Sequence, residues 1–324
     1  MQIFVYESLC AGALGHPGES LIREGRAMLM AIVADFQAIP DVEVVTLFAE
    51  QVAATDERAR FCELASKADW TMVIAPEFDD ILRQRSQDVL DAGGRLLGAS
   101  PDAIELTGDK YALAQHLKHH NVITPRTHIA DPTTIERMCC PFVLKPRHGA
   151  GSQATYLVRK PIEKKRIWRQ AIAEWPENDL IVQEYFKGRA ASLAVISGPG
   201  EFLVLHPAWQ RISRDGRFRY LGGVVPLEGH SARLAYGMGK MVAECMDGLQ
   251  GYFGIDIVLG AETDVVIEIN PRLTTSYIGL RRLCQDNLAH AILRAVMGNE
   301  IGNLRWSDDT FTFDADGKVR IRSE

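Results

Sequence analysis

The chain has 324 residues, of which 47% are hydrophobic and 24% charged, and its formal net charge is −6. This length is enough for more than one domain, because domains typically have about 150 residues. The negative charge argues against general binding of nucleic acid or of anionic membranes. No apolar run approaches the roughly 20 residues that span a bilayer, and the N-terminus lacks the basic start of a signal peptide. We therefore expect a cytoplasmic protein, with six reduced cysteines that show no metal-ligand spacing.

The first hundred residues alternate between strand-like and helix-like patterns. Strands are expected at residues 2–6, 42–48, 70–75 and from 95, and helices at about 19–36, 57–67 and 78–92. This alternation predicts an α/β domain over residues 1–99 with a parallel, doubly wound sheet.

Two acidic loops follow strands of this predicted sheet, at residues 7–15 and 76–80. Ligands of doubly wound sheets bind beyond the carboxyl ends of the strands. Glu7 and Glu77 would therefore place negative charge where it suits a substrate that carries an amine. The alternative is that such acids only stabilise the N-termini of the helices that follow them.

The middle of the chain contains two lysines and a glycine-rich turn. A capped helix is expected from Ser100, a second helix starts near Lys110, and a buried strand ends in Lys145. The turn that follows includes Gly149, Gly151 and Ser152. Backbone N–H groups of such a turn can surround phosphate oxygens while an ammonium group supplies charge. Taken alone, glycine turns between strands are common, and a single lysine is most often solvated.

The next strand runs from Leu180 into a short stretch at a strand-to-turn joint, consisting of Gln183, Glu184, Tyr185 and Phe186. Exposed backbone at such a joint can recognise the flat edge of a base. A plain hairpin corner is the alternative.

Two apolar runs, 253–259 and 265–269, flank a polar turn and predict a β-hairpin. Glu268 and Asn270 are two residues apart and share one face of an extended strand, and Asp256 comes opposite them if the hairpin pairs around its turn. Two carboxylates and an amide oxygen suit Mg²⁺ together with phosphate oxygens. Arg272 follows at once and is ready to bind a phosphate or an anionic intermediate. An ordinary hairpin with polar ends is the alternative.

The order of these motifs resembles that of the ATP-grasp superfamily of carboxylate–amine ligases, over about residues 100–288. The resemblance implies an N-terminal substrate domain followed by α+β grasp lobes, a central one at 100–182 and a C-terminal one at 183–324. The segments FVYESLCAGAL and EINPRLTTSYIGL are most similar to the subgroup of the tyramine–glutamate ligases of methanofuran biosynthesis, whose relatives serve C1 metabolism.

The resemblance also implies roles for single residues. Lys110 and Lys145 would hold the phosphates of ATP under a mobile loop with Gly149, Gly151 and Ser152, while residues 183–186 would contact adenine. Asp256, Glu268 and Asn270 would bind Mg²⁺, usually two ions, or Mn²⁺. One departure is Ala190, which stands where many members have an acid that binds the ribose, so Glu184 becomes the candidate for that contact.

The implied reaction activates an acid as an acyl phosphate with release of ADP, and an amine then attacks the acyl carbon. Arg272 is the expected oxyanion donor, and Arg211 is a second candidate, although a surface arginine is as consistent with its strand. Thr274, Thr275 and Ser276 could bind a substrate carboxylate, or Ser276 could cap the helix that follows. The alternatives are a ligase for another amino-acid pair, a carboxylase, and a nucleotide-binding regulator without turnover. The expected partners are small-molecule acids and amines, and the resemblance also allows a homodimer.

Overall fold

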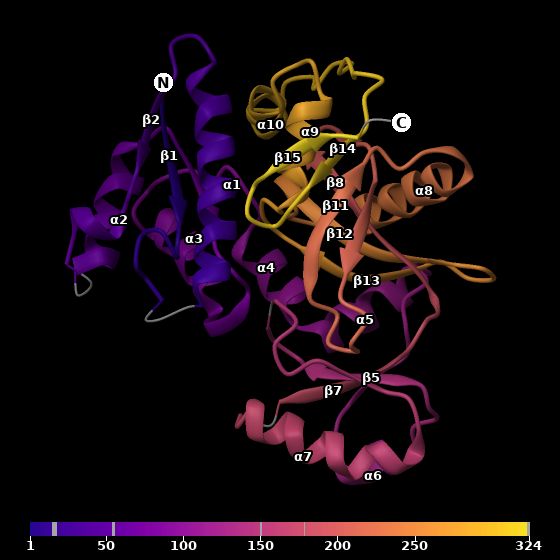
Figure 1. The fold of residues 1–324 in the computed structure, drawn as a ribbon. Helices are drawn as coiled ribbons and strands as arrows, with labels where there is room; N and C mark the ends of the chain where they lie inside the picture. The colour runs from indigo at the N-terminus through magenta and orange to yellow at the C-terminus, as the bar shows by residue number, and fades with distance from the viewer. Residues whose placement is uncertain (15–17, 54–55, 150, 178, 323–324) are drawn as a thin grey trace.

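The computed structural model describes residues 1–14, 18–53, 56–149, 151–177 and 179–322. Figure 1 shows three sheets in chain order: a small sheet at the N-terminus, a second small sheet at the far end of the molecule, and a large sheet beside the first. Within the described residues, no helix has both the length and the apolarity needed to cross a bilayer.

The N-terminal sheet is parallel, with the order β2-β1-β3. Its strands are β1 (Gln2–Glu7), β2 (Glu43–Thr46) and β3 (Trp70–Ile74), and Leu96 adds a parallel bridge to Thr71. Alternate residues of β1 enter two different cores, because successive side chains of a strand point to opposite faces. Ile3 and Val5 pack with α1 (Glu19–Gln37) on one face, and Phe4 and Tyr6 pack with α2 (Glu57–Lys67) and α3 (Ile81–Asp91) on the other. The predicted doubly wound domain is confirmed.

Two helices lead from this domain to the second sheet. Ser100 caps α4 (Pro101–Gly108) by accepting a hydrogen bond from the backbone of Ala103, as expected from the sequence, and Asp109 caps α5 (Lys110–His119). The second sheet is antiparallel, with the order β4-β7-β5-β6. Its elements are β4 (Thr127–Ile129), α6 (Pro132–Arg137), β5 (Phe142–Pro146), β6 (Tyr156–Val158), α7 (Lys164–Glu174) and β7 (Leu180–Glu184). We call this part, residues 127–184, the small lobe.

The large sheet is antiparallel, with the order β13-β12-β8-β10-β11-β14-β15, and β9 pairs with β8. Its strands are β8 (Gly188–Ser197), β9 (Phe202–Val204), β10 (Ala208–Ile212), β11 (Tyr220–Val225), β12 (Gly251–Gly260), β13 (Val265–Asn270), β14 (Phe311–Phe313) and β15 (Val319–Ile321). The helices beside this sheet are α8 (Gly229–Cys245), α9 (Ser276–Leu283) and α10 (Leu288–Val296). Elsewhere, short 3₁₀ turns lie in the N-terminal domain at Ala49–Gln51 and Phe78–Asp80 and in the small lobe at Pro161–Glu163. The predicted domain limits stay a prediction, and β7 crosses the expected limit at residue 182.

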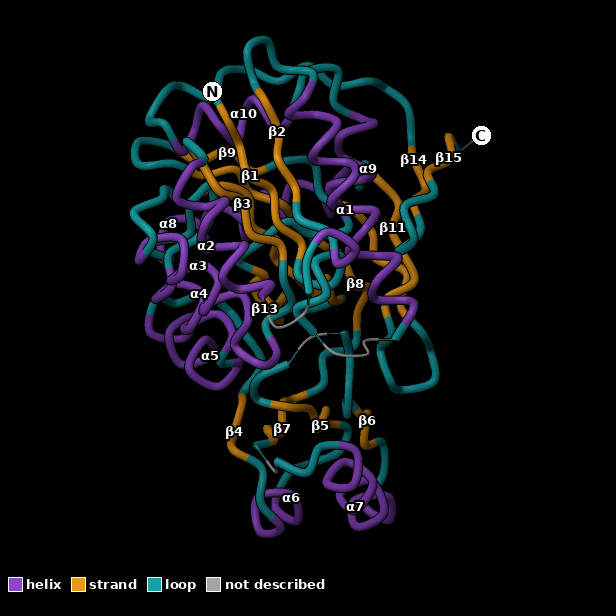
Figure 2. Tube along the Cα trace, turned by 90° about the vertical axis from the view of Figure 1, so that its left-hand side faces the viewer, coloured by secondary structure: helices purple, strands orange, loops and turns teal. Residues whose placement is uncertain are grey.

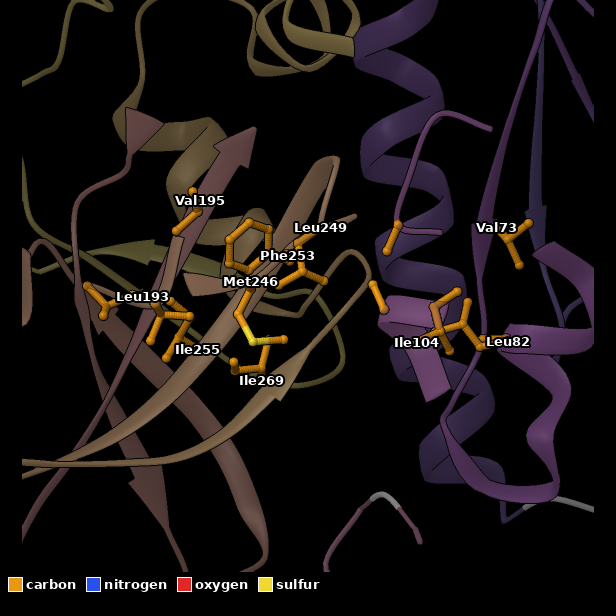
Figure 3. Close-up of a cluster of buried hydrophobic side chains, with 14 of the residues drawn as sticks. Val73, Leu82, Ile104, Leu193, Val195, Met246, Leu249, Phe253, Ile255 and Ile269 are labelled. Atoms are coloured by element: carbon orange, nitrogen blue, oxygen red, sulfur yellow. The ribbon is translucent and has the colours of Figure 1, made fainter. Parts of the chain in front are cut away.

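The N-terminal domain and the large sheet share their hydrophobic cores. One cluster joins Val73, Leu82 and Ile104 to residues of the large sheet such as Phe253 and Ile255, and Figure 3 shows part of it. A second cluster joins α1 to β3, α9 and α10. The small lobe has a separate core, and Figure 2 shows its sheet and two helices as a distinct layer at one end of the molecule. We call the N-terminal domain together with the large sheet the body.

Candidate active site

The β12–β13 hairpin brings the three predicted metal ligands together. Asp256 pairs directly with Glu268 across the two strands, and Gly254 pairs with Asn270. Because Glu268 and Asn270 lie on the same face of β13, both side chains meet Asp256 on the cavity side of the sheet. Gly254 leaves room for the neighbouring loop, since a Cβ there would lie 2.5 Å from a methyl carbon of Thr274.

The electrostatics of this trio favour a bound cation. Burial, and after it the neighbouring Glu268, raises the pKa of Asp256 to about 7. Burial acts to raise the pKa of Glu268 as well, but the charges of Lys110, Lys145 and Arg272, together with a hydrogen bond to Asp256, outweigh it and lower that pKa. Asp256 Oδ1 accepts a hydrogen bond from Gln210 Nε2 at 2.7 Å, and Oδ2 accepts one from Asn270 Nδ2 at 3.2 Å.

Two desolvated carboxylates beside an amide form a donor set that fits Mg²⁺. Three or more His, Cys, Asp and Glu side chains do not gather anywhere in the described chain in a way that could hold a metal ion. A cation bound between Asp256 and Glu268 would therefore take further ligands from phosphate oxygens or water. This is the usual arrangement for Mg²⁺ in phosphoryl-transfer sites.

Both predicted lysines line the same cavity as this trio, and their charges act on Glu268. Lys145 stands on β5 and is only 7% exposed, and burial lowers its pKa to about 8. Lys110 is the first residue of α5, and its Nζ donates a hydrogen bond to the carbonyl of Gly149 at 2.5 Å. Lys110 is also fixed through its neighbour Asp109, whose carboxylate holds Arg147 in two contacts at 2.8 and 2.6 Å. The sequence reasoning did not include Asp109 or Arg147 among the functional residues.

The predicted glycine loop closes one side of the cavity with Gly149, Gly151 and Ser152. Gly151 has a φ of +68°, a left-handed conformation that glycine adopts without strain. Ser152 Oγ donates a hydrogen bond to the carbonyl of Phe218, which belongs to the segment between β10 and β11. The loop of the small lobe therefore touches the large sheet. Ala150, within the predicted loop, lies outside the described residues.

The residues expected to contact adenine also line the cavity, and they are Gln183, Glu184, Tyr185 and Phe186. The first two end β7, which pairs with the Lys145 strand β5. Gln183 is buried, and its amide Nε2 donates to Thr127 Oγ1 at 3.0 Å, so its side chain is engaged within the small lobe. Glu184 lies 3.6 Å from Arg126 Nε and keeps a partly exposed carboxylate. Ala190, which stands at the position expected for a ribose-binding acid, also lines the cavity. Glu184 lines it too and stays the candidate for the ribose contact.

All these groups surround one cavity of about 360 Å³ between the small lobe, the large sheet and the N-terminal domain. Glu7, Thr274, Thr275 and Ser276 line its end toward the N-terminal domain. The Glu7 carboxylate is 2% exposed and accepts a hydrogen bond from the backbone of Cys10 at 2.8 Å, and burial raises its pKa. It lies against Gly25 of α1, where a Cβ would come within 2.6 Å of it.

Two of the three hydroxyl groups after Arg272 are joined in a network, and the third bonds to α1. Thr274 Oγ1 and Ser276 Oγ lie 2.8 Å apart, and both contact the hydroxyl of Tyr252. Thr275 Oγ1 donates to the carboxylate of Glu24 on α1. The N-cap of α9 is Thr275, and it makes no capping hydrogen bond with its side chain, so the capping alternative for Ser276 is not what the structure has.

Two predicted residues are not part of the cavity wall. Arg211 lies on β10, where the flanking residues Gln210 and Ile212 line the cavity, and its guanidinium contacts the carbonyl of Leu221 and the carboxylate of Asp314 instead. The expectation that Arg211 points at the reacting centre is therefore corrected by the alternation of side chains along a strand.

Glu77 is the second of these residues, since it does not face the cavity as an amine-binding acid. Its carboxylate forms an ion pair with Arg272, which does line the cavity.

Sequence reasoning missed Gln210, Glu24 and Tyr220, which all line the cavity. The alternation along β10 was a signal for Gln210, because it faces away from Arg211. For Glu24 the signal was the helical spacing with Leu21 and Met28, which places these side chains on neighbouring positions of one helix face. Nothing in the local pattern pointed to Tyr220.

Two family models match this chain: an ATP-grasp domain over residues 107–276 and a pre ATP-grasp 3 domain over residues 40–104. The first match covers more than half of the chain. The chain belongs to the ATP-grasp family. The superfamily and the fold that the order of motifs predicted are thereby confirmed.

This ATP-grasp chain is similar to the tyramine–L-glutamate ligase of Methanocaldococcus fervens, with 24% identity over 308 residues, 89% of this chain and 92% of that protein. The enzyme of the same name from Methanocaldococcus jannaschii is 22% identical over 93% of this chain and 92% of that protein. A solved ATP-grasp superfamily protein from Archaeoglobus fulgidus has a TM-score of 0.73 and 25% identity, over 96% of this chain and 92% of its own. The predicted enzyme class, an ADP-forming C–N ligase, agrees with these comparisons.

Proposed function

We propose that the protein joins a carboxylic acid to an amine in an ATP-dependent reaction that passes through an acyl phosphate and releases ADP and phosphate. The observation that carries the proposal is the division of charge in the cavity. Lys110, Lys145, Asp256 and Glu268 line the part of the cavity formed by α5, the small lobe and the β12–β13 hairpin, and the acidic Glu7 and Glu24 line the part formed by the N-terminal domain. The first set suits a nucleotide with its metal, and the second suits a substrate with an ammonium group.

In this proposal the two lysines hold the phosphates of ATP, and residues 183–186 hold the adenine. Asp256, Glu268 and Asn270 would hold Mg²⁺, or Mn²⁺ in its place, with two ions as the expectation. The bound cation would neutralise charge on the transferring phosphoryl group. Gln210 fixes one oxygen of Asp256, so the carboxylate would be oriented before the cation arrives.

The acid would bind near Arg272, and its carboxylate would attack the terminal phosphorus of ATP. The carboxylate oxygen forms the new P–O bond, ADP leaves, and the product is the acyl phosphate. The amine nitrogen then forms the C–N bond, phosphate leaves, and the nitrogen loses a proton. Arg272 would stabilise the oxyanion of this second step. The loop at Gly149 and Ser152 would exclude water, which would otherwise hydrolyse the acyl phosphate.

For the substrates we propose glutamate and tyramine, or a related amine, in the synthesis of a methanofuran-like C1 cofactor. The support is the likeness to tyramine–L-glutamate ligases over most of both chains. The proposal includes a homodimer, which the mass of the enzyme in solution would test.

The deciding experiment measures ADP release from ATP and Mg²⁺ with glutamate, with and without tyramine. We expect release that depends on both substrates, and an amide product with the mass of the two minus water. Turnover that needs no amine would exclude the amide-ligase function, and turnover that requires bicarbonate would indicate a carboxylase. ATP binding without turnover for any acid and amine would indicate a regulatory protein.

A further inference from the structure

A buried ion pair connects the N-terminal domain to the reacting end of the cavity. Glu77 lies in the loop after β3, and Arg272 lies in the loop after β13. Arg272 Nε lies 2.9 Å from Glu77 Oε1, and Arg272 Nη2 donates to Glu77 Oε2 at 3.0 Å. The side chains are 15% and 7% exposed. Both oxygens of the carboxylate therefore face the same guanidinium, and the contact from Nη2 has the geometry of a hydrogen bond, while Nε and Oε1 are an ion pair without one.

The two members of the pair have different positions relative to the cavity. Arg272 lines the cavity, whereas Glu77 is not among the residues of its wall. A further contact holds the guanidinium from the protein side, because Nη1 donates to the carbonyl of Leu273 at 3.2 Å. Glu77 thus stands behind Arg272. The N–H groups of Arg272 that contact neither Glu77 nor Leu273 are the ones available to a ligand in the cavity.

The backbone on both sides of the pair is fixed by one hydrophobic core. Ile74, the last residue of β3, and Leu273, which follows Arg272, are 1% and 2% exposed members of the same cluster. The ion pair therefore joins two loops whose separation is set by packing. Such a support can hold a side chain in one orientation without itself touching a ligand.

We propose that Glu77 is a positioning residue that orients Arg272 toward the reacting phosphoryl and acyl groups, in place of the amine-binding role first expected of it. The proposal rests on the function proposed above. It gives the N-terminal domain a part in catalysis, since a carboxylate of that domain determines where a cationic group next to the large sheet points.

The first test compares Glu77→Gln with Asp79→Asn. Gln keeps the size of the side chain but removes its charge, so the ion pair that holds the guanidinium is lost. We expect kcat to fall about 10- to 100-fold, as misplacement of a group at the reacting centre can cost. The KM values for ATP and for the amine should stay within about twofold. Asp79 is an exposed acid of the same loop with a φ of 54°, which Asn tolerates, and its variant should behave as wild type.

The second test is a double-mutant cycle with Arg272→Lys. If Glu77 acts only through Arg272, adding Glu77→Gln to Arg272→Lys should lower kcat no further. Additive losses would overturn the proposal, and so would an unchanged kcat with a raised KM for the amine, which indicates direct amine binding. Circular dichroism and thermal unfolding of each variant show whether a loss of activity comes from unfolding.

Failure of this inference can be separated from failure of the proposed function. If wild type turns over and Glu77→Gln equals Asp79→Asn, the function stands and the positioning role is wrong. If wild type releases no ADP with any acid and amine, the function fails, and the pair is judged by the thermal stabilisation that pyrophosphate gives. This stabilisation should fall in both Glu77→Gln and Arg272→Lys and remain in Asp79→Asn. An unaffected Glu77→Gln would again overturn the proposal.

Discussion

The body and the small lobe hold opposite sides of the same cavity but are stabilised in different ways. In the body, two hydrophobic clusters run from the N-terminal sheet into the large sheet and its helices. Asp35 of α1 adds polar contacts across this junction, since it accepts hydrogen bonds from Arg281 Nε at 2.9 Å and from the hydroxyl of Tyr277 at 2.5 Å. The small lobe has a core of its own, built around Phe142, Leu144 and Leu180.

This difference indicates which parts of the site move together. The metal candidates, Arg272, Glu77 and Glu7 all belong to the body, so their mutual distances are fixed by shared packing. Lys145 and the glycine loop belong to the small lobe, whose separate core lets it move as a unit. Its polar contacts to the body beside the cavity include Ser152 with Phe218 and Arg217 with Glu174. The four predictions below test this division, in order of decreasing effect.

Loss of a metal candidate in the body should have the largest effect. Glu268→Gln removes a charge that is buried beside Asp256, and we expect turnover to fall by about 10³-fold or more, with the fold retained. Steady-state ADP release measures the turnover, and circular dichroism measures whether the fold is retained. The matched control is Glu262→Gln, an exposed acid in the turn of the same hairpin. Near-normal rates for Glu268→Gln would contradict the metal assignment.

Two buried phenylalanines should distinguish the cores. Phe36 of α1 belongs to a cluster of the body and Phe142 to that of the small lobe, and both are 0% exposed. Replacing either by Ala should cost about 3–5 kcal/mol. We expect Phe36→Ala to lower the midpoint of global unfolding, and Phe142→Ala to raise hydrogen exchange mainly within residues 127–184. Exchange that rises equally in both parts after Phe142→Ala would show that the lobe is not an independent unit.

The pH dependence should report on Lys145. Burial lowers its pKa to about 8, and only the protonated amine can hold phosphates. As the pH rises through about 8 the free enzyme loses this charge, so kcat/KM for ATP should fall, by up to about tenfold per pH unit above the pKa. A pH series at saturating acid and amine measures this. Lys145→Arg should abolish the decline, since arginine stays protonated.

The smallest effect concerns the contact between the small lobe and the segment that joins β10 to β11. Arg217 forms an ion pair with Glu174 and lies 4.0 Å from the ring centre of Tyr156. Partly exposed pairs of this kind contribute up to about 1 kcal/mol. Arg217→Gln should therefore raise the KM for ATP by no more than about fivefold and leave kcat unchanged. Arg219→Gln, whose side chain is 67% exposed, is the control. A large fall in kcat would mean that Arg217 has a role in the chemistry.

Much of the site could be predicted because its parts are local patterns. The pairing of Asp256 with Glu268 follows from a hairpin with a short turn, and Lys110 and Lys145 follow from a helix start and a strand end. What could not be predicted depends on contacts between segments far apart in sequence. The ion pair of Glu77 with Arg272 spans 195 positions, and no periodicity reports on it. Which side chains of β10 face the cavity depends on how β10 pairs with β8 and β11, and the sequence does not show this pairing. The sequence analysis therefore chose Arg211, whereas Gln210 reaches the cavity.

In the fold, too, local patterns could be predicted from the sequence and contacts between distant segments could not. Helix α1 and the three parallel strands matched their patterns closely, because the apolar period of each segment carries the information. The independence of the small lobe was not evident from composition, since its core residues look like those of the body. Only the contacts show that Phe142 packs within its own lobe while Phe36 packs across a domain junction.

The carboxylate of Asp109 offers a way to observe the glycine loop without a ligand or an assay. Its Oδ1 accepts hydrogen bonds from the backbone amides of Tyr111 and Ala112, each at 3.0 Å, and from Arg147 Nε at the base of the loop. A shift of Arg147 would change the charge balance that these two amide protons experience. Their chemical shifts would then report on the loop from the first turn of α5, which lies outside it.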